Sequence, residues 1–267
     1  MDKSKGEKIN WDFLTNLPPR SSRLIVLDTE TTGLNHLKNH IIELAAFEIL
    51  NGKITGQNFH FYIKPRVPIE ESAYQVNHIM ASTFSECYEG FYPDEKEQMR
   101  QLLNFIGGSY IFCHNAVFDY YFLTDELVRL GLEQIPRERF RCSMRVMTKE
   151  VRARYPELKM YFKLGSCCDF FKLKGNGMDG QYHSAVYDTF MCAKLVIRIY
   201  DLVEGKVGES ELDFDGVRLD IEKMKKEAQE KKEKGKTKED IDINDITQQI
   251  SNLLKIRVTK KEEENKV

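Results

Sequence analysis

Two carboxylates follow a short apolar run near the beginning of the chain. Asp28 and Glu30 end a run that begins at residue 23, and its continuous apolar residues predict a strand buried on both faces. Residues i and i+2 of a strand point to the same side, about 6–7 Å apart along it. Two such carboxylates repel each other unless a cation lies between them, and hard divalent cations prefer oxygen ligands. The pair indicates a divalent-metal site, although two acids that end a strand at the surface would give the same pattern.

Two further acids and a histidine stand at the starts of predicted helices. Asp119 falls in the first turn of a helix that follows the predicted strand at residues 109–113, where an acid also complements the helix dipole. Asp188 lies five residues after His183, and residues five apart in one helix point about 140° apart. The two side chains converge only if His183 lies in the glycine-containing loop before the helix. A histidine placed there could take a proton from water, whereas a surface histidine is the simpler interpretation of His183 alone.

The surrounding pattern of strands and helices predicts a mixed α/β sheet. Apolar runs at residues 41–50 and 54–63 flank Asn51-Gly52, a strong hairpin signal, so the first three runs predict an antiparallel meander. Later segments alternate short strands with helices, among them a long helix over residues 184–202. We therefore expect an α/β domain in which a meander precedes alternating strands and helices.

Charge divides the chain into unlike parts. Residues 201–267 carry 15 Lys/Arg and 18 Asp/Glu, whereas the rest of the chain has an ordinary globular composition. We expect an N-terminal arm at residues 1–20, a catalytic domain at 21–204, and a charged, partly helical C-terminal tail at 205–267. The net charge of −2 gives no strong overall basic field, but it is an average over these parts.

Other features concern the cellular setting. The six cysteines show no CxxC spacing, which argues against a zinc knuckle and favours reduced, buried thiols in an intracellular protein. No apolar run approaches 18 residues, and no apolar stretch follows the N-terminal lysines. We therefore expect no membrane span and no secretion signal, and an intracellular, cytoplasmic location with the nucleus left open.

The acids and the histidine occur in three motifs that resemble those of the DEDDh exonucleases, the DnaQ-like or polymerase III epsilon-type superfamily. The family motif D-x-E-T-T-G-L is matched by residues 28–34, H-N-A-x-F-D by residues 114–119, and H-x-A-x-x-D by residues 183–188. The resemblance covers about residues 22–202, with the motifs intact and in order. It implies a ribonuclease H-like fold, with an antiparallel meander plus parallel strands flanked by helices. It also implies a metal-dependent 3′–5′ exonuclease that releases nucleoside monophosphates from single-stranded ends.

The resemblance also implies roles for the motif residues. Two Mg²⁺ or Mn²⁺ ions would clamp the attacking and leaving oxygens of the reaction. Asp28, Glu30 and Asp188 would ligate one ion, while Asp28 would bridge to a second ion held through Asp119. His183 would be the general base that activates water.

Further motif residues would contact the nucleotides at the 3′ end. The backbone around two threonines would hold the terminal nucleotide, a leucine would wedge against its base, and an aromatic ring could stack on a base. A histidine in VNHIM lies where the family has a nucleotide-pocket segment, although it is equally consistent with an ordinary loop histidine. These residues are Thr31, Thr32, Leu34, His78, Asn115 and Phe118.

The sequence does not determine whether the substrate is DNA or RNA, or which partners the protein binds. DNA proofreading or repair is favoured over the alternative, RNA trimming by an exoribonuclease. A non-catalytic nucleic-acid- or polymerase-binding module that keeps the fold is the alternative of a different class, and the five intact site residues argue against it. Twelve Lys/Arg against five acids between residues 129 and 174 predict either a basic rim for a single strand or a solvated charged helix.

The tail carries a possible protein-binding face. Four apolar residues recur there at helical spacing and could contact a DNA polymerase or another protein, pack back onto the domain, or self-associate. They are Ile246, Ile250, Leu253 and Leu254.

Overall fold

The computed structural model describes residues 10–80, 82–84, 94–175, 184–217, 221–223 and 225–226. The chain divides into two units, Met1–Arg218 and Leu219–Val267, and the fold described below belongs to the first. The four apolar residues of the tail lie outside the described residues, so their predicted role stays a prediction. Within the described part, no helix has the length and apolar character needed to cross a membrane.

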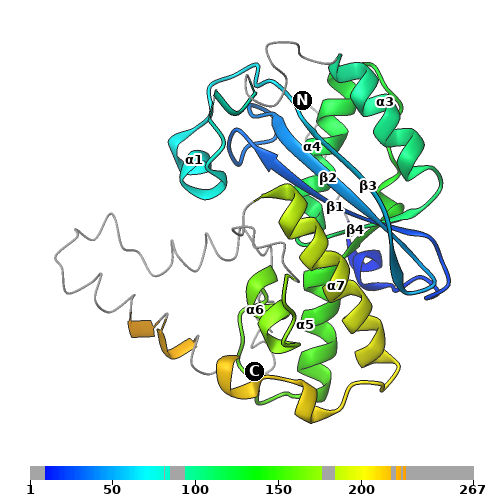
Figure 1. The fold of residues 1–267 in the computed structure, drawn as a ribbon, viewed down its shortest axis with the longest axis vertical. Coiled ribbons are helices and arrows are strands. Elements are labelled where there is room, and N and C mark those ends of the chain that lie inside the picture. Colours follow the sequence, from blue (N-terminus) through cyan, green and yellow to red (C-terminus); the bar gives the residue numbers. More distant parts are fainter. Residues whose placement is uncertain are drawn as a thin grey trace, which may run out of the picture. The chain divides into compact units, whose positions relative to one another are not determined.

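A five-stranded mixed sheet forms the centre of the first unit, in the order β3-β2-β1-β4-β5. β1 pairs antiparallel with β2 and β2 with β3, whereas β1 pairs parallel with β4 and β4 with β5. The strands are β1 (Leu24–Thr31), β2 (Ile41–Leu50), β3 (Lys53–Tyr62), β4 (Tyr110–Cys113) and β5 (Phe140–Cys142). The predicted α/β class and the meander followed by parallel strands are therefore confirmed (Figure 1). Asn51 and Gly52 both have positive φ, 53° and 70°, as expected of the hairpin turn between β2 and β3.

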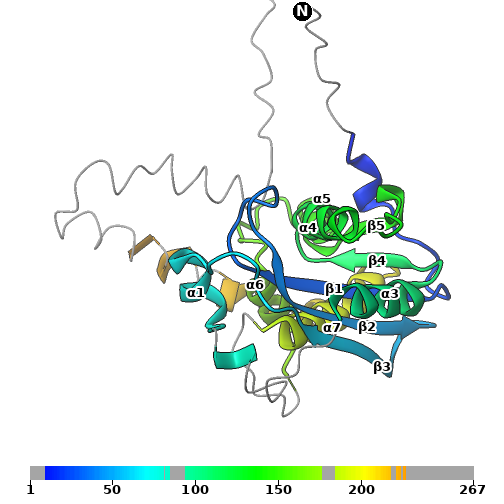
Figure 2. The same ribbon diagram turned by 90° about the horizontal axis from the view of Figure 1, so that it is seen from above.

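Helices cover both faces of this sheet (Figures 1 and 2). α7 packs along β1 and β2 on one face and is accompanied there by α5 and α6, while α3 and α4 contact strands from the other face. The helices are α1 (Glu71–Asn77), α3 (Glu95–Ile106), α4 (Ala116–Arg129), α5 (Ser143–Arg154), α6 (Leu164–Phe170) and α7 (Ala185–Val203).

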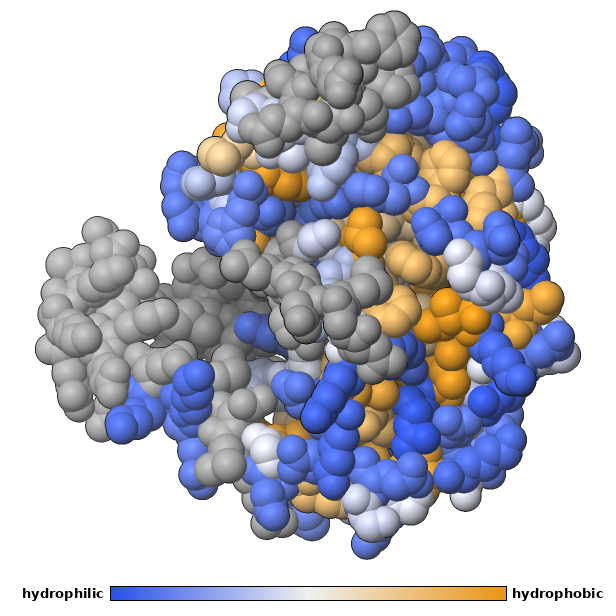
Figure 3. Space-filling model, in the orientation of Figure 1, coloured by the Kyte–Doolittle hydropathy of each residue, from blue (hydrophilic) through white to orange (hydrophobic). Residues whose placement is uncertain are grey.

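Strand alternation decides which side chains meet α7. Leu24 and Val26 of β1 are fully buried and belong to one core cluster with Cys192 and Val196 of α7. Because side chains alternate along a strand, Asp28 and Glu30 point to the same face as Leu24 and Val26. Partly buried hydrophobic residues surround this cluster, and Figure 3 shows hydrophobic side chains gathered over α7 and β3.

Residues 10–20 pack against the domain. Trp11 contacts the rings of Tyr120 and Tyr121 of α4 edge-on, with centroids 5.3 and 5.9 Å apart. Leu14 is fully buried, and the Tyr200 hydroxyl donates a hydrogen bond to the Pro18 carbonyl at 2.8 Å. The C-terminal end of α7 is thus tied to this segment, because Tyr200 lies in its last turns.

Residues after α7 also pack on the domain. Leu212 and Val217 are buried. Phe214 packs against Tyr155 and Phe170, with ring centroids 5.1 and 5.6 Å apart. The predicted boundaries at residues 20/21 and 204/205 are not marked by a loss of packing in the described residues.

Two arginines of the predicted basic rim have structural partners. Arg139 donates hydrogen bonds to the carbonyls of Gly107 and Ser109, and Arg141 is buried, with its guanidinium 4.6 Å from the Tyr110 ring centroid. Their guanidinium groups satisfy main-chain carbonyls rather than facing a ligand. The five described cysteines are buried and reduced, as expected.

Candidate active site

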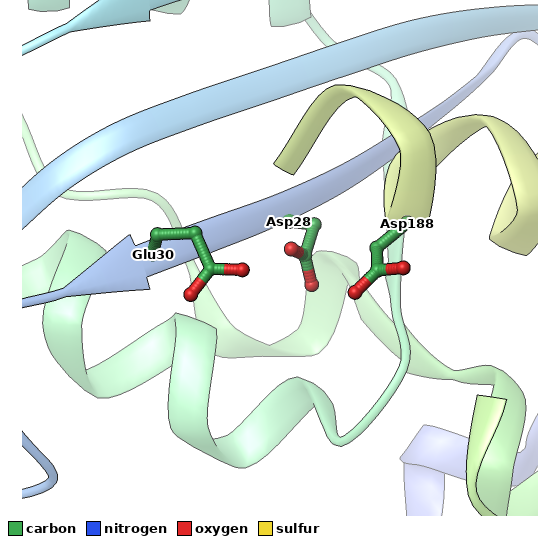
Figure 4. Close-up of side chains that lie close together, drawn as sticks. All are labelled: Asp28, Glu30 and Asp188. Atoms are coloured by element: carbon green, nitrogen blue, oxygen red, sulfur yellow. The ribbon is translucent and has the colours of Figure 1, made fainter. Parts of the chain in front are cut away.

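Three carboxylates from two elements converge at one end of β1. One oxygen from each of Asp28, Glu30 and Asp188 lies within 4.8 Å of the other two. Figure 4 shows the three side chains directed toward a common space between β1 and the start of α7. Three carboxylates at this separation form the oxygen-rich donor set that hard divalent cations prefer.

The convergence follows from the two periodicities of the chain. Asp28 and Glu30 continue the face of β1 that carries Leu24 and Val26 against α7, so they point toward the same helix. Asp188 lies in the first turn of α7, four residues before Cys192, which packs on that face of β1. The predicted same-side placement of Asp28 and Glu30 is therefore confirmed.

Asp119 lies beside this group of three but is held differently. It is in the first turn of α4, is 2% exposed, and accepts a hydrogen bond from the Thr29 hydroxyl at 2.9 Å. Its charge is the largest of the neighbouring charges that raise the pKa of Asp28. Asp119 therefore lies close enough to Asp28 for their charges to interact, and its orientation is set by Thr29.

Burial and mutual repulsion dominate the electrostatics of the site. Burial, followed by the charges of Asp119, Glu30 and Asp188, raises the pKa of Asp28 well above its usual range. Burial also raises the pKa of Glu30 to about 9 and that of Asp119 to about 7. These pKa shifts mean that ionising the acids together is unfavourable without positive charge, and a divalent cation would supply it.

Two residues of the site were not identified from the sequence. Glu43 of β2 is paired with Glu30 in the antiparallel register and contributes to the raised pKa of Glu30. Asn77, at the end of α1, donates a hydrogen bond to the Thr31 carbonyl at 3.2 Å, and its side chain also lowers the pKa of Glu30. An acid inside the apolar run of residues 41–50 was a signal for Glu43. Asn77 had no signal of its own.

The two threonines after Glu30 shape the loop between β1 and β2. The Thr31 hydroxyl donates to the Gly33 carbonyl at 2.7 Å, and the Thr32 hydroxyl donates to Asn39 Oδ1 at 3.0 Å. The Thr32 backbone N–H donates to the His40 carbonyl at 2.9 Å. The Thr32 amide therefore already has a main-chain partner, and the predicted contact between this backbone and a nucleotide stays a prediction.

Four other predicted substrate residues stand close in sequence to residues of the site, and we call them the rim residues. Leu34 is 66% exposed at the tip of the loop. Asn115 and His78 both have positive φ, 81° and 55°, at the start of α4 and the end of α1, respectively. Phe118 is half-buried, with its ring centroid 4.6 Å from that of Phe122. His183 lies outside the described residues, immediately before Ser184, the N-cap of α7.

His114, the first residue of the second motif, orients the loop rather than doing chemistry. Its ring bonds the Ser143 hydroxyl at 2.9 Å and the Phe162 carbonyl at 2.8 Å. Burial lowers its pKa to about 4, so the ring is neutral at pH 7 and donates to Phe162 while accepting from Ser143.

Known proteins are similar to this chain in sequence. Residues 25–196 match the RNase_T exonuclease family. The DNA polymerase III subunit epsilon of Buchnera aphidicola (subsp. Schizaphis graminum) is 34% identical over 182 residues, which cover 66% of this chain and 74% of the relative. That of Rickettsia felis is 33% identical over 180 residues, covering 67% and 74%.

Solved structures share the fold at lower identity. Escherichia coli exonuclease I in complex with a dT13 oligonucleotide superimposes with a TM-score of 0.55 and 15% identity, covering 71% of this chain and 45% of that one. Cell-death related nuclease 4 superimposes with a TM-score of 0.53 and 19% identity, covering 68% and 64%. The motifs, the mixed sheet and these similarities agree: the chain belongs to the DnaQ-like DEDDh exonuclease superfamily and is a 3′–5′ exonuclease.

Proposed function

We propose that this chain removes nucleotides from the single-stranded 3′ ends of DNA in a reaction that requires divalent metal. The convergence of Asp28, Glu30 and Asp188 carries the proposal, because it provides a carboxylate cluster at the end of the sheet. DNA is favoured over RNA because relatives that share about a third of their residues with this chain are DNA polymerase subunits. In each turnover, water bonds to phosphorus as the P–O3′ bond breaks. A nucleoside 5′-monophosphate leaves, and the shortened strand keeps a 3′ hydroxyl.

The carboxylates would hold two Mg²⁺ or Mn²⁺ ions. Asp28, Glu30 and Asp188 would bind one ion, and Asp28 together with Asp119 the other. When bound, the ions would stabilise the negative charge that develops on the attacking and leaving oxygens. Thr29 fixes the orientation of the Asp119 carboxylate through its hydrogen bond, as the hydrogen-bond partners of metal ligands commonly do.

His183 would act as the general base that takes the proton from the attacking water. Its assignment rests on the third motif, in which His183 and Asp188 belong to one short segment at the start of α7. Asp188 stands in the first turn of this helix, so the base and a metal ligand would be supplied by consecutive parts of the chain.

The rim residues would position the terminal nucleotides. The exposed Leu34 would contact the last base, and Phe118 would present its ring edge to a neighbouring base or sugar. Asn115 and His78 stand at helix ends and would contact the sugar-phosphate backbone. Thr31 and Thr32 would act by shaping the loop that presents Leu34.

A direct assay compares single-stranded DNA and RNA of one sequence, labelled at the 3′ end, with Mg²⁺, with Mn²⁺ and with EDTA. We expect label release from DNA that requires metal and that falls by at least about 10³-fold in Asp28→Asn, because two-metal catalysis depends on the bridging carboxylate. Release from neither polymer, or release that persists in EDTA, would contradict the proposal. A faster reaction on RNA than on DNA would assign RNA as the substrate.

We also propose that residues 205–267 hold a DNA polymerase, because DNA polymerase III subunits are among the relatives. Fluorescence anisotropy of the labelled chain, titrated with a replicative polymerase catalytic subunit, would measure binding. A variant that ends at residue 218 keeps the packed segment around Phe214, so it should keep nuclease activity and lose polymerase binding. Equal binding by both forms would contradict the tethering role.

A further inference from the structure

Glu43 is a buried carboxylate in β2, beside the catalytic acids but not among them. It is 1% exposed and lies opposite Glu30 in the antiparallel pair of β1 and β2. Both of its oxygens have partners: Oε2 accepts the backbone N–H of Ala185 at 3.1 Å, and Oε1 accepts a hydrogen bond from His60 Nε2 at 2.9 Å. These two bonds connect β2 with the start of α7 and with β3.

The bond to Ala185 satisfies the first turn of α7. Ala185 is the first residue of the helix, and the first N–H groups of a helix have no partner within it. Ser184, at the N-cap, makes no side-chain capping hydrogen bond, so Glu43 takes the place of a local cap from another element. A carboxylate at this end also interacts favourably with the helix dipole.

A second bond ties the same turn to β2. The Thr189 hydroxyl donates to the Ala45 carbonyl at 3.3 Å, and Ala45 lies two residues after Glu43 in the strand. Asp188 stands between Ala185 and Thr189 in the sequence. The turn that carries this metal-ligand candidate is therefore fixed to β2 on both sides, while β1 carries Asp28 and Glu30 next to β2.

We infer that Glu43 is a positioning residue for the exonuclease reaction, which fixes the first turn of α7 and thereby holds Asp188 against Asp28 and Glu30. It works through the reach of its side chain to Ala185. His60, from β3, holds the other carboxylate oxygen and so fixes the plane of the group. The inference rests on the proposed function, because it assigns Glu43 to the geometry of that metal site.

The reach of the side chain and its charge can be separated by two conservative substitutions. Glu43→Gln keeps the length: its amide oxygen can accept the Ala185 N–H, and its amide group can donate to the His60 ring. Glu43→Asp keeps the charge but is one methylene shorter, so it cannot hold both partners. We expect Glu43→Gln to remain within about threefold of the wild type, and Glu43→Asp to lose at least about tenfold, as small displacements at reacting centres do.

The measurements are Mn²⁺ affinity, from the electron paramagnetic resonance signal of free Mn²⁺, and kcat and KM on single-stranded DNA. Glu43→Asp should lower Mn²⁺ affinity and kcat while KM changes by less than about threefold, because the defect lies at the metal ligands and not at the nucleotide contacts. A loss in Glu43→Gln as large as that in Glu43→Asp would overturn the inference, since charge would then be the essential property. Wild-type behaviour of Glu43→Asp would overturn it as well.

Glu48 provides a matched control in the same strand. It is also buried and bonded, to Arg23 and to the Thr55 hydroxyl, but its partners lie away from α7. Glu48→Gln and Glu48→Asp should alter thermal unfolding and leave Mn²⁺ affinity unchanged. A wild-type protein that binds Mn²⁺ but releases no nucleotide would contradict the proposed function alone, because the Mn²⁺ affinities of the Glu43 variants would still test the inference.

Discussion

Two groups of buried and half-buried acids in this protein differ in how their charge is balanced. The first, which we call the catalytic acids after their proposed role, consists of Asp28, Glu30, Asp119 and Asp188. The second, which we call the acid pair, consists of Glu95 at the start of α3 and Glu126 near the end of α4. In the acid pair, Glu126 is fully buried and forms an ion pair with Arg129, and Glu95 forms one with Arg66.

The partners of the catalytic acids are of another kind. Asp119 is bonded by the Thr29 hydroxyl and Glu30 by the Asn77 amide, which are both neutral groups. Burial and the neighbouring Glu126 raise the pKa of Glu95, and the charge of Arg66 lowers it in part, whereas the charges around Asp28 all raise its pKa. The chain thus supplies the acid pair with its own arginines, whereas the catalytic acids would be neutralised by the proposed ions. Such ions can also contact substrate, which a buried arginine held in an ion pair cannot do.

The largest expected difference between the two groups is in the stability of the metal-free protein. Glu126→Gln should lower the free energy of unfolding by about 3 kcal/mol, because it leaves Arg129 without its partner in a buried setting. Asp28→Asn should leave this free energy unchanged or raise it, because it removes one of several repelling carboxylates. Urea unfolding at pH 8 in EDTA measures both. A loss of stability in Asp28→Asn as large as that in Glu126→Gln would contradict the comparison.

Metal should stabilise the folded protein through the catalytic acids and not through the acid pair. At a Mn²⁺ concentration of about 100 times its Kd, wild type should gain about 2.7 kcal/mol of unfolding free energy, since ions that bind only the folded state add this amount by linkage. Glu126→Gln should show the same gain, because its defect lies in the acid pair, and Asp28→Asn should show little. Urea unfolding with and without Mn²⁺ checks this. A smaller gain in Glu126→Gln would mean that the two groups are coupled.

Much of the catalytic group could be predicted from the sequence because it depends on short-range periodicity. Alternation along β1 puts Asp28 and Glu30 on one side whatever the neighbouring strands do. The hairpin at Asn51-Gly52 also followed from local turn chemistry, and it placed β2 beside β3. The meander and the parallel strands after it were therefore predictable.

The remaining contacts depend on strand register and join residues that are far apart in the sequence. They could not be predicted from local sequence patterns. Glu43 meets Ala185, 142 residues later, only because β2 pairs with β1 in one register and α7 crosses that face. Asn77 reaches Thr31 because α1 returns to the end of β1. The hydrogen bond from the Thr32 amide to the His40 carbonyl arises from the closure of a loop. No motif indicates it, so it could not be predicted from the sequence.

The smallest expected effect is the change in the free energy of unfolding with pH. Its response to metal distinguishes the catalytic acids from the acid pair. Without metal, the folded-state pKa values of Glu30 and Asp119 are about 9 and about 7, above their usual values of 4.5 and 3.8. Between roughly pH 4 and pH 9 the folded state therefore binds more protons than the unfolded state. Stability is then fully present at low pH and is lost as pH rises through this window. We expect these two groups to give a slope of about −2 kcal/mol per pH unit near pH 7, since together they hold about 1.5 extra protons in the folded state and each proton contributes about 1.4 kcal/mol per pH unit.

Saturating Mn²⁺ should remove or reverse this slope, because the ions bind the ionised carboxylates and protons then compete with metal. Glu95, whose pKa burial raises to about 7, contributes a slope of the same sign that Mn²⁺ should not change, so Glu95→Gln serves as the control that isolates the catalytic acids. Urea unfolding at pH 5 to 9, with Mn²⁺ and with EDTA, measures all of these slopes. A slope that disappears in Glu95→Gln and ignores Mn²⁺ would assign the pH dependence to the acid pair and leave the catalytic acids electrostatically unstrained.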